Sequence, residues 1–68
     1  MNNTYLVSSF GENADSNWLT TADGKEINIT THQAQKLWEI WVMTRKPTKK
    51  THKGETVYKY ANPMEFIL

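Results

Sequence analysis

An Asp-Gly pair inside an alternating apolar segment constrains the fold of this chain more than any other feature. Asp23 and Gly24 interrupt residues 18–29, which otherwise have the composition of β-strands. Asp-Gly is favoured in two-residue type I′ turns, because both turn positions need a positive φ. Such a turn predicts a hairpin with one apolar face. Leu19 is the one apolar residue that does not fit, because it falls on the opposite face. The members of that face are Trp18, Thr20, Ala22, Ile27 and Ile29.

Residues 32–45 have the periodicity of an amphipathic helix. The segment contains no glycine or proline, and its apolar residues recur three or four positions apart. Thr30 and Gln33 match a capping box at its start, and Pro47 ends it. The residues that follow this spacing are Ala34, Leu37, Trp38, Trp41 and Val42.

Strand-like composition also marks residues 4–10 and 55–61. Gly54 could turn a second hairpin whose first arm is the lysine-rich segment before it. Residues 62–65 have the sequence Asn-Pro-Met-Glu, with Asn suited to a helix N-cap and Pro to the first helical position. They predict a short C-terminal helix, and an extended tail is the alternative.

These elements predict an α+β fold in which residues 1–68 form a single small domain. A small antiparallel sheet, with elements in the order β-β-β-α-β, would pack on one amphipathic helix, with a second short helix at the C-terminus. The expected core consists of Leu6, Trp18, Ile27, Ile29, Leu37, Trp38, Trp41 and Val57.

Small size makes the source of stability a question for this chain. Its 68 residues include no cysteine, so neither a disulfide nor a cysteine zinc site can stabilise it. Ordering the chain costs about 100 kcal/mol, at roughly 1.5 kcal/mol per residue, and apolar burial must offset this. Three tryptophans, three tyrosines and two phenylalanines could form an efficient core. The alternative is a partner subunit that completes the core, as in a homodimer.

Charge is distributed unevenly along the chain. Residues 1–44 carry two lysines against five acidic residues, a charge of −3, whereas residues 45–68 carry six basic residues against two acidic ones, a charge of +4. The basic segment 45–59 favours contact with nucleic acid, since lysines meet phosphates and tyrosines stack on unpaired bases. The alternative is a solvated loop with its tyrosines in the core. The residues predicted for the contact are Arg45, Lys46, Lys49, Lys50, Lys53, Tyr58 and Lys59.

Apolar residues cover a wide arc of the predicted helix. Placed at about 100° per residue, the five residues that follow the helical spacing and Ile40 spread over roughly 200°, which is more than one small sheet covers. The remainder could face a second molecule, since tryptophan is enriched in binding hot spots. This predicts a protein-binding inhibitor or adaptor that docks through a helix face or a sheet edge. Its candidate residues are Leu19, Trp38, Trp41 and Met43.

Catalysis and metal binding find no support in the sequence. The three serines lie outside any nucleophile motif, and the three glycines are too scattered to form a phosphate-binding loop. His32 and His52 have no second histidine at helical spacing. We therefore expect a non-enzymatic protein without metal or cofactor. The first residues lack the features of a signal peptide, and no apolar run approaches the roughly 18 residues of a membrane span, so we expect a cytoplasmic location.

The sequence therefore favours a small binding protein with two alternative partners. Nucleic acid, bound through segment 45–59, is the first hypothesis. A larger protein, bound through the aromatic helix face or a sheet edge, is the second. Compact chains without cysteine are typical of phage and mobile-element accessory proteins, including anti-defence inhibitors, and this general character agrees with the second hypothesis.

Overall fold

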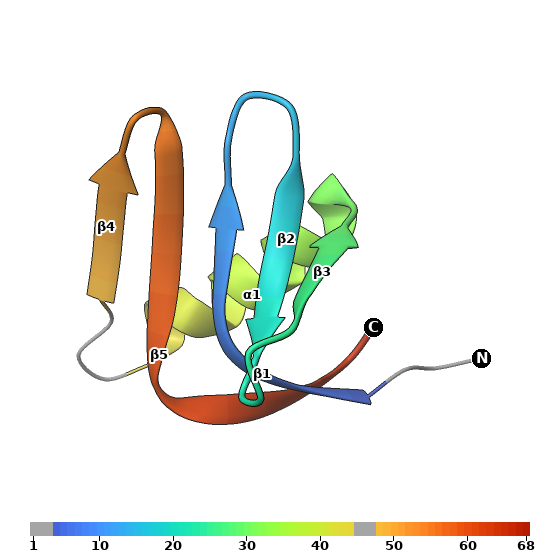
Figure 1. Ribbon diagram of the computed structural model, residues 1–68. Coiled ribbons are helices and arrows are strands. Elements are labelled where there is room, and N and C mark those ends of the chain that lie inside the picture. Colours follow the sequence, from blue (N-terminus) through green and yellow to red (C-terminus); the bar gives the residue numbers. More distant parts are fainter. Residues whose placement is uncertain (1–3, 45–47) are drawn as a thin grey trace.

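The computed structural model describes residues 4–44 and 48–68, which form a five-stranded antiparallel sheet with one helix on one side (Figure 1). The strand order is β3-β2-β1-β5-β4, so β1 lies between the hairpin β2–β3 and the hairpin β4–β5. The elements are β1 (Thr4–Glu12), β2 (Asn17–Thr21), β3 (Glu26–Ile29), α1 (Thr31–Met43), β4 (Thr48–His52) and β5 (Glu55–Ile67).

The predicted α+β class and antiparallel sheet are confirmed, and the element order gains one strand. The lysine-rich segment forms β4 and pairs with β5 through the turn at Lys53 and Gly54, both of which have positive φ. The predicted C-terminal helix is wrong, because residues 62–65 belong to β5. Between the pairs Ser9–Lys59 and Val7–Met64, four residues of β5 oppose one residue of β1. Pro63 lies in this bulge, where a strand tolerates the missing N–H group.

The hairpin β2–β3 exists as predicted, but its register differs by one residue. Leu19 pairs with Ile27, and the Thr21 N–H donates to the Lys25 carbonyl oxygen at 2.9 Å. The loop therefore has three residues, and Gly24, with φ of 91°, occupies the left-handed position that such loops place last. A shift of one residue turns the side chains of one strand to the opposite face relative to its partner, so Leu19 instead of Trp18 shares a face with Ile27.

The observed core differs from the predicted one, and the register of this hairpin accounts for the exchange of Trp18 for Leu19. Leu37 and Trp41 are buried as predicted, and Ile27 and Ile29 pack against the core. Leu19, the residue that fitted the predicted hairpin least well, is completely buried. Four predictions are wrong: Leu6 and Trp38 are 49% and 45% exposed, and Trp18 and Val57 are half-buried on the face away from the helix. The core consists of Val7, Phe10, Leu19, Leu37, Trp41, Tyr58 and Tyr60.

Two hydrogen bonds attach α1 to β5. The Trp41 Nε1–H donates to the Lys59 carbonyl oxygen at 3.0 Å, and the Tyr60 hydroxyl donates to the Leu37 carbonyl oxygen at 2.6 Å. The helix begins with the predicted capping box of Thr30 and Gln33. It ends at Met43, two residues before the predicted end, and residue 45 lies outside the described residues.

A bulge at Ser8 bends the central strand. The register of β1 shifts between Val7 and Ser9 toward both neighbouring strands, and the Ser8 hydroxyl donates to the Thr20 carbonyl oxygen at 3.1 Å. Beyond this point the first residues of β1 pair only with the end of β5 and with the Thr21 region of β2. Figure 1 shows β5 curving sharply where its C-terminal half joins the start of β1.

Removing the Tyr60 hydroxyl tests the attachment of helix to sheet. We expect Tyr60→Phe to lower the free energy of unfolding by about 1 kcal/mol, because a buried hydrogen bond is lost while the ring remains. Urea denaturation followed by circular dichroism measures this change. Tyr5→Phe, which removes a hydroxyl from a half-buried tyrosine of β1, is the control. Equal losses in the two variants would contradict a specific role for the Tyr60 hydroxyl.

Candidate functional site

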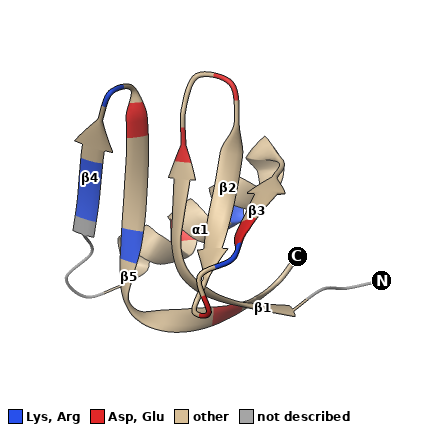
Figure 2. Ribbon diagram, viewed as in Figure 1, with Lys and Arg blue, Asp and Glu red and all other residues tan. Residues whose placement is uncertain are grey.

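The described lysines of the basic segment gather on the β4–β5 hairpin, at one edge of the sheet (Figure 2). Lys50 lies opposite Val57 and Lys49 lies opposite Tyr58, so the two neighbouring lysines point to opposite faces. Lys53 lies in the turn. The predicted basic residues are therefore divided between the two faces of the sheet and the turn of the β4–β5 hairpin. Arg45 and Lys46 lie outside the described residues.

The face of the sheet away from α1 combines basic and aromatic side chains, and we call it the open face. Direct pairing across four strands places Trp18, Gly11, Val57 and Lys50 in one row, because paired residues of antiparallel strands share a face. Lys59 follows Val57 by two positions and belongs to the same face. No helix in the described part of the chain packs on this face.

The indole of Trp18 lies against Gly11 of β1. A Cβ atom placed on Gly11 would come within 2.5 Å of Trp18 Cζ2, so the absence of a side chain at Gly11 makes room for the indole. Trp18 as a whole is half-buried. Sequence reasoning placed Trp18 in the core and missed its role on the open face. The only sequence signal for this contact was Gly11, a glycine whose missing side chain leaves room for a large neighbour.

Acidic residues limit how far the basic surface extends. Glu26 and Glu55 both lie on the open face, where they line a hollow together with Trp18 and Val57. Glu55 also faces His52 at the end of the β4–β5 hairpin. Figure 2 accordingly shows the blue residues of β4, of its turn and of β5 at one side of the sheet. A polyanion would therefore be drawn to the β4–β5 side and would reach Trp18 across β1.

Tyr58 is a core residue and offers no free ring for a base. It stacks on Phe10 with ring centroids 4.7 Å apart, and the edge of Trp41 meets it at 4.9 Å. Its hydroxyl donates to Glu12 Oε1 at 2.7 Å, and the Lys49 ammonium lies 5.8 Å from its ring centroid. Tyr58 should thus be removed from the predicted nucleic-acid contacts.

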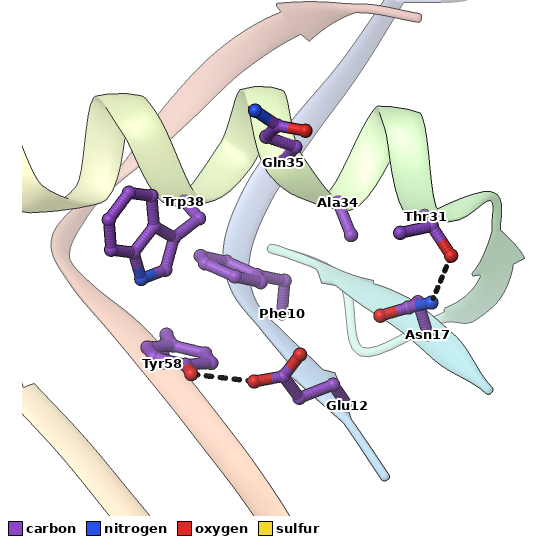
Figure 3. Close-up of a pocket in the computed structure, with 8 residues that line it drawn as sticks. All are labelled: Phe10, Glu12, Asn17, Thr31, Ala34, Gln35, Trp38 and Tyr58. Carbon is purple, nitrogen blue, oxygen red and sulfur yellow. Dashed lines mark hydrogen bonds between the residues drawn. The ribbon is translucent and has the colours of Figure 1, made fainter. Parts of the chain in front are cut away.

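The predicted protein-binding residues divide between the core and the helix surface. Leu19 and Trp41 are buried, whereas Trp38 and Met43 are exposed. Trp38 borders a cleft of about 260 Å³ between α1 and the helix-facing side of the sheet (Figure 3). The residues that line it are Phe10, Glu12, Asn17, Thr31, Ala34, Gln35, Trp38 and Tyr58.

Residues 4–44 and 48–68 offer neither a metal-binding cluster nor a membrane-spanning helix. These residues contain no group of three histidine, cysteine, aspartate or glutamate side chains that could hold a metal ion. They also contain no helix with the length and apolar character needed to cross a membrane.

Comparison with known proteins identifies no relative. The chain matches no protein-family model, no curated protein and no solved structure. The geometry of the open face and of the cleft is therefore the basis on which a function is proposed.

Adding a methyl group at Gly11 tests the contact with Trp18. We expect Gly11→Ala to lower the free energy of unfolding by about 1–3 kcal/mol, since the indole must shift to make room. In a Trp18→Ala background the same substitution should have a clearly smaller effect. Urea denaturation of the four proteins in this double-mutant cycle measures the coupling. Equal effects in both backgrounds would mean that the indole does not lie over Gly11.

Alkaline titration tests the environment of Tyr58. Burial, with a smaller contribution from Glu12, raises the pKa of Tyr58 to about 12 from 10. Because the pKa is higher in the folded state, the stabilisation is complete below pH 10 and is lost as the pH rises through about 12. We expect a loss of about 1 kcal/mol from this group, after allowance for solvent screening.

Absorbance of tyrosinate provides the measurement. Tyr58→Phe should remove one of the high-pH transitions, and Glu12→Gln should lower the pKa of Tyr58 because it removes the negative charge beside the hydroxyl. A titration curve that is unchanged in both variants would contradict the contact between Glu12 and Tyr58.

Proposed function

We propose that this chain binds single-stranded nucleic acid on the open face of its sheet. The observation that carries the proposal is that Trp18 shares this face with Lys50 and Lys59. Bases and phosphates, the two parts of a nucleotide, thus each have a matching group on one surface.

Trp18 would provide the stacking platform. Its ring is supported by the Gly11 backbone, so little conformational entropy remains to be lost when a base stacks on it. Stacking of a base on an aromatic side chain contributes about 1–3 kcal/mol and tolerates any base sequence. Val57, between Trp18 and Lys50 in the row, adds an apolar surface for a neighbouring sugar or base.

The lysines would neutralise phosphates on the β4–β5 side. Lys50 lies three strands from Trp18, which corresponds to about 14 Å at the usual strand spacing. Lys59 and Lys53 extend the positive charge along β5 and into the turn. A strand of nucleic acid that crosses the sheet from β2 to β4 would meet the aromatic ring first and the charges next.

Single strands fit this surface better than duplexes. Bases in a duplex are stacked on one another and cannot stack on Trp18, whereas unpaired bases can splay onto an aromatic side chain of a sheet. The proposed role is binding without chemistry, with affinity that comes from charge and stacking.

Salt dependence of binding tests the proposal. We expect a fluorescently labelled oligothymidine to bind with a salt slope near −2, because three lysines on a single strand contribute about −0.7 each. Affinity should then fall about twentyfold between roughly 50 and 200 mM salt. Fluorescence anisotropy measures the dissociation constants, and a duplex of the same length should bind more weakly.

Matched variants separate the open face from general charge. Lys50→Ala and Lys59→Ala should each reduce the salt slope by about 0.7, and Trp18→Ala should reduce affinity by about 1–3 kcal/mol. Lys36→Ala, on the exposed side of α1, is the control with the same change in charge. The proposal fails if the oligonucleotide does not bind at low salt, or if the control weakens binding as much as Lys50→Ala.

A further inference from the structure

The residues that line the cleft between α1 and the sheet include one carboxylate, Glu12, and two side-chain amides, Asn17 and Gln35, and none of them is positively charged. Glu12 is held in place because the Tyr58 hydroxyl donates to its Oε1 atom at 2.7 Å, which leaves Oε2 available. Asn17 donates its Nδ2–H to the Thr31 hydroxyl at 3.4 Å, so its amide oxygen is turned toward the cleft (Figure 3). A molecule that satisfies this end of the cleft must be a hydrogen-bond donor.

The opposite side of the cleft is aromatic and apolar. Trp38 projects from α1 beside the ring of Phe10, and Ala34 completes this wall (Figure 3). Trp38 is 45% exposed, although tryptophans usually have most of their surface buried. The wall suits a methylene chain or a flat cation, since both pack on an indole.

We propose that this cleft binds an arginine side chain of a protein partner. A guanidinium carries a positive charge and five N–H donors in a plane, so it can pair with the free oxygen of Glu12, donate to the Asn17 amide oxygen and contact Trp38. The methylene stem of arginine matches the wall of Ala34 and Phe10. Lysine has the charge but lacks the planar group, so it should bind less well.

The occupant comes from another molecule of complementary charge. Glu12 gives the cleft a negative end, while the β4–β5 edge is positive, so a segment with an isolated arginine is favoured over a polybasic one. The cleft lies on the helix-facing side of the sheet and the nucleic-acid proposal concerns the other side. The two proposals are therefore independent, and one protein could hold both ligands at once.

Nuclear magnetic resonance of the indole N–H groups provides the test. The three tryptophans of this chain report on three places: Trp38 on the cleft, Trp18 on the open face and Trp41 on the core. We expect the peptide acetyl-Gly-Arg-Gly-amide to shift the Trp38 signal in a saturable way, with a dissociation constant on the order of 1 mM. The Trp18 and Trp41 signals should stay in place, which also shows that the fold is intact.

Two controls make the result specific. The same peptide with citrulline, a neutral group of nearly the same shape as arginine, should give no saturable shift. Glu12→Gln should weaken binding of the arginine peptide about tenfold, because the amide still accepts the Tyr58 hydroxyl but lacks the charge. Glu26→Gln, on the opposite face of the sheet, should leave binding unchanged.

Three outcomes would overturn the proposal. Equal shifts with arginine and citrulline peptides would show that charge plays no part. Absence of a Trp38 shift up to about 20 mM peptide would show that the cleft does not bind arginine in the expected range. Dimerisation detected by sedimentation, abolished by Glu12→Gln, would show that the occupant is a second copy of this chain instead of another protein.

Discussion

A reciprocal pair of hydrogen bonds between α1 and β5 is the constraint on which the rest of the structure depends. The helix donates to β5 through Trp41, and β5 donates to the helix through Tyr60. Trp41 and Tyr60 are both buried residues, and an unpaired polar atom in their place would be costly. Because β5 also pairs with β1 and β4, this attachment fixes the helix relative to both sides of the sheet.

One helix cannot cover both faces of five strands, and this explains why the molecule has two different candidate surfaces. A helix of 13 residues is about 20 Å long, enough for one face of a sheet about 19 Å across. The face under the helix becomes the core and leaves a cleft at its border. The other face stays uncovered and carries Trp18. The lysines of β4 also lie on an edge strand, where charge discourages pairing with other chains.

Local chemistry in the sequence predicted most elements, while long-range geometry was beyond it. The capping box of Thr30 and Gln33 and the existence of both hairpins follow from neighbouring residues. The pair Asp23-Gly24 fits a loop of two or three residues, so it could not decide which of two adjacent apolar residues points inward. Pro63 resembled a helix start in the sequence. The bulge that accommodates it in β5 is created by pairing with β1, which neighbouring residues do not reveal.

The candidate sites show the same division. The sequence located the basic hairpin, but the face on which each lysine lies depends on strand register. The contact between Glu12 and Tyr58 joins residues 46 positions apart, and no local pattern encodes it. The role of Trp18 on the open face was missed for the same reason that Trp18 was placed in the core. The register of the β2–β3 hairpin decides which of Trp18 and Leu19 is buried.

The three-residue loop of the β2–β3 hairpin therefore has a consequence for how such a protein can change. Side chains alternate along a strand, so the parity of the loop decides whether Trp18 or Leu19 faces the helix. Deletion of a single loop residue would present leucine to solvent and tryptophan to the core, with no change in either strand. The number of residues in this loop thus decides which side chains of β2 are buried and which are exposed. Gain or loss of one codon could therefore convert a binding surface into a packing surface.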